Sequence, residues 1–145
     1  MKRKSDGKDS PTKIPKLEYT YSPIDTSILK IDFTSVKENK DIVPQFNKIA
    51  DMVLNKWVIN VNNKHYRFSE IEFYLNHKQH PDTFTHGDEM QSILGNWYFH
   101  RAGKSYKSGS YKGLDLSFGQ GDNSHGGILI RSIQSLEDGS ITEGP

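Results

Sequence analysis

Residues 57–75 read WVINVNNKHYRFSEIEFYL, and this stretch decides the fold. Two runs rich in β-branched and aromatic residues, 57–61 and 65–75, flank the pair Asn62-Asn63. Such runs favour strands, and asparagine tolerates the left-handed backbone that a two-residue hairpin turn requires. The stretch therefore predicts an antiparallel β-hairpin that turns at the two asparagines.

The residues around this hairpin predict one helix and three further strands. Residues 42–54 place apolar side chains on one face at helical spacing, namely Ile42, Phe46, Ile49, Ala50 and Val53. Pro44 suits the first turn of a helix, where its missing N–H costs nothing. Strand-like runs follow at 96–101, 113–118 and 127–133. One helix followed by mostly antiparallel strands predicts a single α+β domain over residues 21–145, with the helix packed on a curved sheet.

Composition limits the class of protein. The chain has 145 residues, of which 33% are hydrophobic and none is cysteine. The absence of cysteine excludes a disulfide scaffold and thiolate metal sites, and it fits a reducing compartment. No apolar run approaches the ~18 residues that a membrane span needs, and the start of the chain lacks the apolar stretch of a signal peptide. We expect a soluble protein inside the cell, with no membrane partner.

Residues 1–20 are polar and rich in lysine, and we expect them to form a disordered tail. Within residues 1–17, six basic side chains oppose two acidic ones, which gives a charge of +4 and leaves −3 of the net +1 to the remainder. The clusters Lys2-Arg3-Lys4 and Lys13-Ile14-Pro15-Lys16 resemble a two-part nuclear import signal. This predicts a nuclear protein that binds an import receptor; the alternative is a solvated tail without a role, in a cytoplasmic protein.

Two loops interrupt the predicted strands. Residues 76–94 are rich in histidine and aspartate, and loops of this length are uncommon unless they carry function. Residues 102–113 combine glycines with basic and aromatic side chains that suit phosphate contact and base stacking: Lys104, Tyr106, Lys107, Tyr111 and Lys112. The alternative for this second loop is a mobile hairpin made soluble by lysine. No Walker-type or dinucleotide-binding glycine motif is present in the sequence.

Strict alternation along residues 66–75 divides the second hairpin strand into two faces. The core face would carry Ile71, Phe73 and Leu75, and the opposite face Tyr66, Phe68, Glu70, Glu72 and Tyr74. Two carboxylates about 7 Å apart along a strand, flanked by aromatic rings, form either an ordinary solvated face or one wall of a pocket. In a pocket, burial and mutual repulsion would favour one carboxylate as a proton acceptor.

From residue 48 onward the chain resembles the alkyladenine (3-methyladenine) DNA glycosylases. Their helix motif is matched by residues 50–54, and their Glu-Thr-Glu-Ala-Tyr-Leu strand by residues 70–75. An Asp and a His four residues later are matched by Asp82 and His86, and a glycine before an aromatic strand by residues 95–100. A Val-Leu-Ile-Arg stretch is echoed by residues 128–133 and on to Gly139, and residues 143–145 look like the start of a later Gly-Pro element.

The resemblance implies a DNA repair enzyme, a monofunctional N-glycosylase of base excision repair that flips a damaged or alkylated purine out of DNA and hydrolyses its glycosidic bond without a cofactor. By position, Glu72 would activate the water and balance charge on the sugar. Tyr74 and His86 would stack on the base, and His100 takes the place of a second stacking tyrosine. Arg131 would support the water and a phosphate. DNA is the implied partner, and we expect a monomer.

Three departures from the family pattern bear on activity. The turn after the aromatic strand, 101–103, holds no aromatic wedge, although Tyr106 could substitute. The pocket asparagine of the family is replaced by Asp115, a carboxylate that would repel a purine edge or phosphate unless it is protonated or paired. The chain also ends where the family continues, which predicts a divergent, C-terminally short member.

Other functions fit parts of the sequence. A catalytically inactive module that binds a modified base or a nucleic acid on the same fold is the main alternative, supported by the missing wedge and the acidic body. Paired carboxylates could also serve sugar hydrolysis. A metal site could use residues of the long loop and its neighbours, namely His77, His80, His86, His100, Asp82 and Asp88. No helical His-x-x-x-His pair occurs, so we predict no metal.

Overall fold

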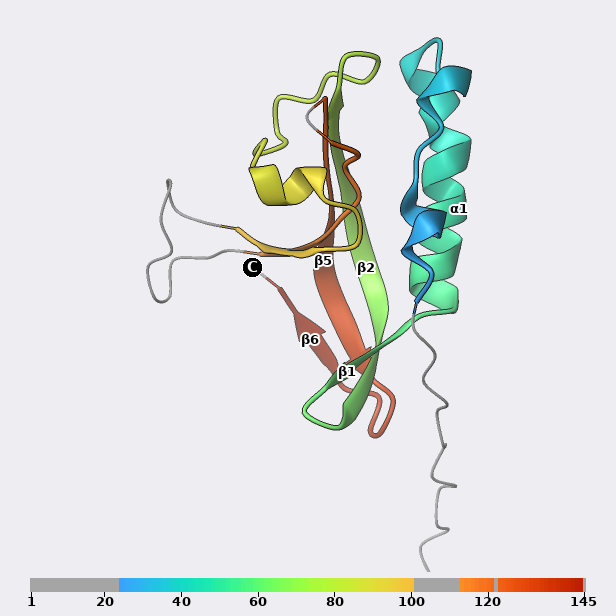
Figure 1. Ribbon diagram of the computed structural model, residues 1–145. Helices are drawn as coiled ribbons and strands as arrows, with labels where there is room; N and C mark the ends of the chain where they lie inside the picture. The colour runs from blue at the N-terminus through green and yellow to red at the C-terminus, as the bar shows by residue number, and fades with distance from the viewer. Residues whose placement is uncertain (1–23, 101–112, 122, 145) are drawn as a thin grey trace, which may run out of the picture.

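The structure is a computed structural model that describes residues 24–100, 113–121 and 123–144. Residues 1–20, with the proposed import signal, lie outside the described residues. The proposed nucleic-acid loop also lies outside them, with its side chains Lys104, Tyr106, Lys107, Tyr111 and Lys112. The described part is a small α+β domain in which one helix packs on a curled antiparallel sheet (Figure 1).

The predicted hairpin is present. Strand β1 (Val58–Val61) pairs antiparallel with β2 (Lys64–His77), and Val61 lies opposite Lys64 across the turn. Asn62 and Asn63 have φ values of 51° and 62°, the left-handed conformation that a type I′ turn needs at both central positions. The strand β2 extends two residues beyond the predicted end, so it forms one of the two long ribbons of the sheet.

The predicted helix is α1 (Val43–Asn55), which begins with Pro44 in its first turn. It lies along one face of the sheet beside β2 (Figure 1). Three short 3-10 helices precede it, η1 (Thr26–Leu29), η2 (Phe33–Ser35) and η3 (Asn39–Ile42). The sequence patterns did not predict these turns, although they bring fully buried side chains to the core between helix and sheet, including Leu29, Val36 and Ile42.

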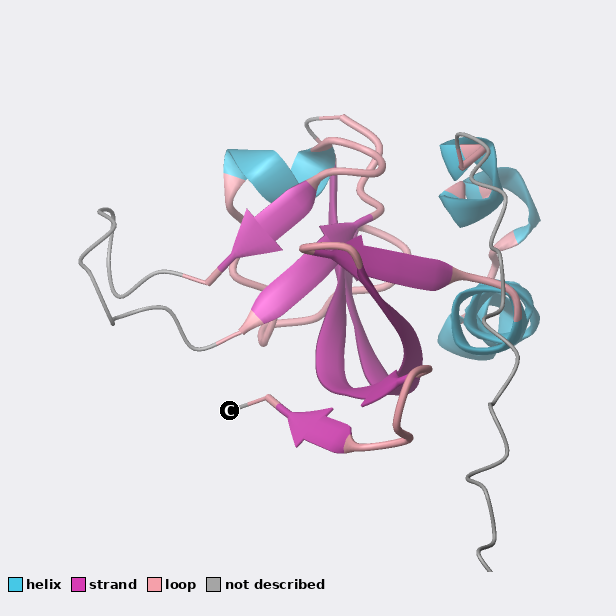
Figure 2. Ribbon diagram, turned by 90° about the horizontal axis from the view of Figure 1, so that it is seen from below, coloured by secondary structure: helices cyan, strands magenta, loops and turns pink. Residues whose placement is uncertain are grey.

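The sheet has the order β1-β2-β5-β4-β3, with every neighbouring pair antiparallel. Its remaining strands are β3 (Trp97–Phe99), β4 (Leu114–Ser117), β5 (Ser124–Ser135) and β6 (Ile141–Glu143). One edge of β5 pairs with β2, while the other edge is shared by β4 at residues 127–129 and by β6 at residues 132–134. Seen from below, the sheet is strongly curled, and the long helix lies to one side of it (Figure 2). Strand β6 was not predicted.

The predicted orientation of Phe68 is wrong, because two register shifts interrupt the pairing of β2 with β5. They fall between Phe68 and Glu70 and between Glu70 and Ile71, at the point where β2 and β5 bend. A bulge adds a residue to one strand and breaks the strict alternation of its side chains. Phe68 therefore lies in the core and is 5% exposed, whereas the alternation placed it on the opposite face. Beyond the bulge the predicted alternation holds, and Phe73 stacks on Phe46 of α1 with ring centroids 4.6 Å apart.

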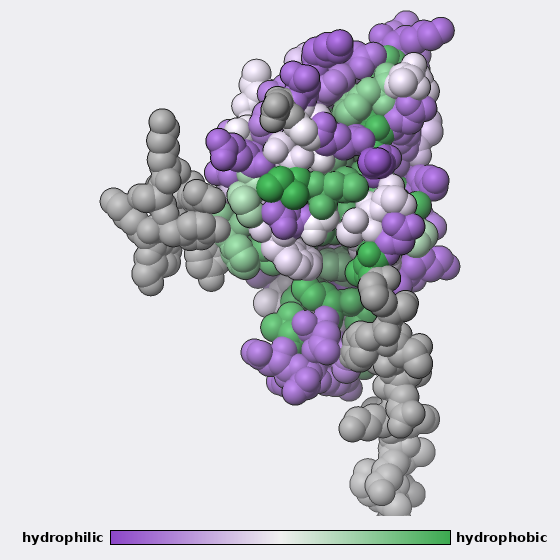
Figure 3. Space-filling view, viewed as in Figure 1, coloured by the Kyte–Doolittle hydropathy of each residue, from purple (hydrophilic) through white to green (hydrophobic). Residues whose placement is uncertain are grey.

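The surface offers apolar side chains in several places. Figure 3 shows hydrophobic surface gathered across the middle of the viewed face, between hydrophilic regions at both ends. Large exposed apolar side chains of the described residues include Phe84, Trp97, Phe99 and Ile141. No described helix is both long enough and apolar enough to cross a membrane.

Candidate functional site

The face of the sheet opposite α1 carries a buried carboxylate. Asp115 of β4 lies across from Leu129 of β5 and Tyr98 of β3, and its side chain is fully buried. Its Oδ2 accepts a hydrogen bond from Gln91 Nε2 at 3.1 Å, and its Oδ1 accepts one from His100 Nε2 at 2.7 Å. A buried carboxylate is tolerated only when its oxygens are paired. Both oxygens of the Asp115 carboxylate are therefore paired, as its full burial requires.

Two glycines make room for this pair. A Cβ on Gly127 would lie 2.2 Å from Asp115 Oδ2 and 2.8 Å from its Cγ, so the carboxylate rests directly on the backbone of β5. A Cβ on Gly113 would lie 2.9 Å from Leu129 Cδ1 and 3.4 Å from His100 Cδ2. Glycine at these positions lets a strand backbone approach the neighbouring side chains closely. The two glycines therefore shape the space around Asp115 and His100, one from β5 and the other from the residue before β4.

The loop after β2 is fixed by a second aspartate. Asp82 accepts hydrogen bonds from the backbone N–H of Phe84 at 2.8 Å, from Thr85 Oγ1 at 3.1 Å and from the backbone N–H of Leu75 at 3.3 Å. These bonds tie the loop to β2 and place residues 84–86 beside the end of that strand. Asp82 thereby fixes Phe84 and Thr85, the two residues that precede His86.

A short 3-10 helix, η4 (Glu89–Ser92), supplies the remaining polar side chain of this face. Asp88 caps it by accepting from the backbone N–H of Met90 at 3.0 Å, and Gln91 Oε1 accepts from the backbone N–H of Asp88 at 3.3 Å. The nitrogen of the same amide, Gln91 Nε2, donates to Asp115. The capping box therefore orients Gln91, which joins the loop to the sheet.

Aromatic rings cover the buried carboxylate. His86 and His100 have ring centroids 4.6 Å apart, and Tyr98 lies 5.2 Å from His100. His86 Nδ1 forms a 3.2 Å hydrogen bond with the Tyr98 hydroxyl. The two histidines therefore have different hydrogen-bond partners: His86 is bonded to a phenol and His100 to a carboxylate.

These groups surround a cavity of about 230 Å³. The rings of Tyr74, Phe84, His86 and His100 line it, and Gln91, Asp115, Thr85 and Leu129 complete its wall. Phe84 is 81% exposed and therefore stands at the mouth. Mostly aromatic walls with a few fixed polar groups are typical of sites for small ligands. The cavity is suited to a flat, uncharged or delocalised ring that stacks on several side chains.

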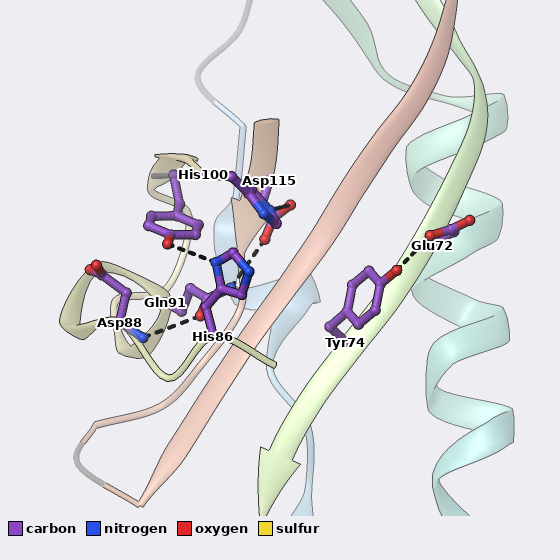
Figure 4. Close-up of polar contacts among 8 residues, drawn as sticks. Glu72, Tyr74, His86, Asp88, Gln91, His100 and Asp115 are labelled. Carbon is purple, nitrogen blue, oxygen red and sulfur yellow. Dashed lines mark hydrogen bonds and ion pairs between the residues drawn. The ribbon is translucent and has the colours of Figure 1, made fainter. Parts of the chain in front are cut away.

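Glu72 lies next to this cavity, joined to it through Tyr74. The Tyr74 hydroxyl donates a hydrogen bond to Glu72 Oε2 at 2.7 Å, and Arg131 Nε lies 3.6 Å from Glu72 Oε1 (Figure 4 shows the Tyr74–Glu72 bond). The hydrogen bond to Glu72, and then burial, raise the pKa of Tyr74 above its usual value, so the phenol stays protonated. A protonated Tyr74 keeps the Glu72 carboxylate at the edge of the cavity.

The structure brings together every predicted site residue that it describes. Tyr74, His86 and His100 come from β2, the following loop and the end of β3, and all three line one cavity. Glu72 and Arg131 form the adjacent ion pair. Sequence reasoning missed Gln91 and Phe84. Gln91 follows Asp88 by three residues, which is the capping-box spacing and a usable indication; nothing in the pattern indicated that Phe84 would be exposed at the mouth.

The histidines of the alternative metal site divide between two places. His77 stacks on Phe33 with centroids 3.8 Å apart, and His80 meets the edge of Phe46, on the core side of the sheet. His86 and His100 lie together at the cavity. Among the described residues no group of three or more His, Asp or Glu side chains is placed to hold a metal ion.

A larger cavity of about 380 Å³ lies elsewhere, between β1, β3 and the segment around η1. Its wall includes Trp57, Ile59, Phe68 and Trp97, and none of its lining residues is titratable. It offers apolar surface without an acid, a base or a charge. The smaller cavity, with its paired carboxylate, imidazoles and neighbouring ion pair, is the candidate functional site.

Comparison with known proteins gives a relative without a described activity. An uncharacterized protein of Acanthamoeba polyphaga mimivirus is 40% identical over 113 residues, which cover 69% of this chain and 52% of the relative. The chain thus spans about half the length of the curated relative that it matches. No protein-family model and no solved structure matches the chain.

Proposed function

We propose that the 230 Å³ cavity binds a damaged purine flipped out of DNA, and that the chain hydrolyses the N-glycosidic bond of that nucleotide. The observation that carries this proposal is the convergence of Tyr74, His86 and His100 on one cavity from three separate segments. Glu72, the candidate carboxylate, is bonded to the first of these rings. All four residues match glycosylase positions in the sequence, and their proximity in the structure supports the proposal.

The size and walls of the cavity suit a single base. Its volume is below the about 300–1,000 Å³ typical of sites for drug-sized ligands, which favours one flat ring system. Stacking a base on an aromatic side chain contributes about 1–3 kcal/mol and depends little on base identity. Four rings around the cavity can therefore offset the few kcal/mol that unstacking the target base costs. One of the four, Phe84, is exposed at the mouth, where a neighbouring base can stack.

Glu72 is the proposed general base. Its carboxylate would take a proton from water as the water attacks the sugar carbon, and its charge would balance the positive charge that develops on the sugar. Tyr74 holds one oxygen of this carboxylate, and Arg131 lies beside the other. The reaction needs only water as co-reactant. A place in base excision repair, a nuclear location and an import receptor for the basic tail belong to the same proposal.

A second candidate is a binding module without catalysis. Glu72 lies beside the cavity and is not among the residues that line it, and its carboxylate already accepts a hydrogen bond from Tyr74. A carboxylate held outside the cavity in this way favours binding without catalysis. The same aromatic cavity would then recognise a modified base in DNA or single-stranded nucleic acid, and hold it intact.

The test is release of free base from alkylated duplex and single-stranded DNA by the wild type, Glu72→Gln and Glu70→Gln. The second variant is the matched control, because Glu70 lies two residues away on the same strand and is exposed. We expect release by the wild type and by Glu70→Gln. Removing the general base should lower the rate of Glu72→Gln by about 10²–10⁴-fold.

Each alternative result has a distinct meaning. Equal release by all three proteins would exclude Glu72 as the general base. An absence of release, together with tight binding of the same oligonucleotides by folded protein, would support the binding module. An absence of both release and binding would overturn the assignment of this cavity to a base.

A further inference from the structure

The larger cavity, of about 380 Å³, shares no lining residue with the site proposed for a base. Both tryptophans of the chain, Trp57 and Trp97, line it. Trp57 packs against the core, whereas Trp97 is 42% exposed and therefore stands at the mouth. Tryptophan is among the side chains that contribute most to protein–protein binding when a partner covers it. The cavity therefore has the character of a second recognition site.

One wall of this cavity is the edge of a strand. Four consecutive residues, 57–60, line it, and the last three of them belong to β1. Successive side chains of a strand point to opposite faces, so a cavity on one face alone would contact every second residue. Contact with all four means that the backbone edge of β1 forms part of the wall. β1 is the first strand of the sheet, and β2 pairs with its other edge.

The turn of the hairpin determines which backbone groups face the open edge. Val61 and Lys64 are the two ends of the tight turn, and the hydrogen bond of such a turn joins them. Hydrogen-bonded and non-hydrogen-bonded pairs alternate along an antiparallel ladder, so Asn60 and Val58 belong to pairs of the second kind. The N–H and C=O groups of these two residues therefore point away from β2, and both residues line the cavity.

The hairpin that carries this edge is basic. Residues 52–69 contain Lys56, Lys64 and Arg67 and no acidic side chain. All three cations are exposed, and the two lysines lie before and after β1. β1 itself contains neither the proline nor the charged side chain that often protects the edge of a sheet. Charge complementarity therefore favours an occupant that carries acidic groups on both sides of its apolar part.

We propose that this cavity is a docking site for an extended, acidic segment of a partner protein, which pairs with the open edge of β1 and inserts a ring beside Trp97. Hydrogen bonds to the backbone of Val58 and Asn60 require a polypeptide, and this requirement excludes a lipid or a small apolar molecule as the occupant. Addition of a strand to an exposed edge, with a pocket for alternate side chains, is a general mode of peptide recognition. A second copy of the chain fits less well, because β1, the edge that it would offer, carries no ring.

The first experiment measures binding of a synthetic peptide with blocked ends, Asp-Glu-Phe-Val-Phe-Glu-Asp. The peptide contains no tryptophan, so the fluorescence of the full chain reports on this cavity alone. A peptide with lysine in place of each acidic residue is the matched control. We expect saturable binding of the acidic peptide, and an affinity at least about 10-fold lower for the lysine peptide at low salt.

Variants of the full chain then test the ring at the mouth by calorimetry with the acidic peptide. Trp97→Ala should bind at least about 10-fold more weakly, the loss expected for an interface tryptophan. Ile141→Ala is the matched control, because it removes an exposed apolar side chain of β6, away from the cavity. This control should bind as the wild type does.

Two substitutions at one position test the strand edge. Asn60→Pro removes the outward N–H, whereas Asn60→Ala removes the same side chain and keeps that N–H. Proline is tolerated on an edge strand when its nitrogen faces outward, so both variants should fold. We expect Asn60→Pro to bind the acidic peptide about 3–10-fold more weakly than Asn60→Ala, which corresponds to one backbone hydrogen bond. Amide hydrogen exchange of the wild type gives a second readout, in which the peptide should protect the N–H groups of Val58 and Asn60.

The outcomes are distinct, and none of them depends on release of a base. Equal affinity of Asn60→Pro and Asn60→Ala, with unchanged exchange of both amides, would refute strand addition. Equal binding of the acidic and lysine peptides would overturn the acidic class of partner. No binding at about 1 mM peptide would reject the site, and self-association of the chain that Trp97→Ala abolishes would then assign the cavity to a second copy. Displacement of the peptide by oligothymidine would assign it to nucleic acid instead. If Asn60→Pro does not fold, amide exchange and Trp97→Ala decide.

Discussion

Replacement of Gly127 by alanine tests the construction of the site most directly. The added Cβ would lie 2.2 Å from Asp115 Oδ2, 2.8 Å from Cγ and 3.2 Å from Cβ. Rotation of the carboxylate alone cannot remove this overlap, because Cγ itself is too close. The whole Asp115 side chain must move, and its two bonds, 3.1 Å to Gln91 and 2.7 Å to His100, cannot both survive.

The size of the effect follows from these contacts. Forcing extra atoms into a packed site costs about 1–3 kcal/mol, and loss of one hydrogen bond to a buried charge costs about 1.5–3 kcal/mol. We expect Gly127→Ala to lower the free energy of unfolding by about 3–5 kcal/mol, a large part of the roughly 5–15 kcal/mol that stabilises a typical domain. For a domain of this length the melting temperature should fall by on the order of 10–20 °C.

A double-mutant cycle measures the energetic coupling between residues 127 and 115. It compares the free energies of unfolding in urea of the wild type, Gly127→Ala, Asp115→Ala and the double variant. In the Asp115→Ala background the two closest atoms are gone, so adding the methyl group at residue 127 should cost less than about 1.5 kcal/mol. Gly126→Ala is the matched control, since its Cβ would meet Phe118 at 3.1 Å on the other face of β5. Gly126→Ala should lower the free energy of unfolding by the same amount with and without the Asp115 side chain.

The reasoning is refuted by either of two results. The first is a Gly127→Ala protein as stable as the wild type, which would mean that Asp115 does not rest on this backbone. The second is a cost for Gly127→Ala that persists unchanged after Asp115 is removed. That result would place the clash elsewhere and would separate Gly127 from the His100 pair.

Four further predictions address the loop, the mouth and the titration of the fold. Asp82→Ala should lower stability by about 1–3 kcal/mol, seen in urea unfolding, and weaken base binding, because three hydrogen bonds that fix the loop are lost. Phe84→Ala should weaken binding of modified oligonucleotides by about 1–3 kcal/mol without changing stability, and equal affinity would exclude stacking at the mouth. Hydrogen bonds from Ser140 lower the pKa of Asp138 to about 2, so its stabilising contribution is complete above 3.8 and is lost as pH falls through about 2. Asp138→Asn should therefore reduce the loss of unfolding free energy as pH falls from 3.8 to about 2. Burial lowers the pKa of His77 below 6.5, so the folded state favours its neutral form, and stability should decline as pH falls below 6.5. An NMR titration of His77 with an ordinary midpoint would contradict this.

Local rules were sufficient for the helix and the hairpin. The apolar spacing of residues 42–54 and the position of Pro44 predicted α1 to within one residue at each end. Asn62-Asn63 predicted the turn because few residue pairs adopt two successive left-handed conformations. Both features depend on interactions between residues close in sequence, which a pattern can represent.

The features that failed depend on distant residues. The bulges that turn Phe68 toward the core arise where β2 must bend with β5, and no alternation rule contains the partner strand. Strand β6 has three residues, all of them exposed, and it pairs with the part of β5 that extends beyond the end of β4. The 3-10 helices before α1 are too short to give a periodic pattern, although they bury Leu29 and Val36.

Asp115 and His100 are the two positions of the cavity where the sequence differs from the glycosylase pattern that it resembles. On sequence alone, Asp115 predicts a repulsive charge beside the cavity. The structure places these two side chains 2.7 Å apart, with both carboxylate oxygens occupied by His100 and Gln91. His100 and Asp115 both line the cavity, and the charge of the carboxylate is offset by hydrogen bonds from the imidazole and from the Gln91 amide. The sequence could not predict this pairing, because Gln91, His100 and Asp115 are separated by 9 to 24 residues and meet only in the folded sheet.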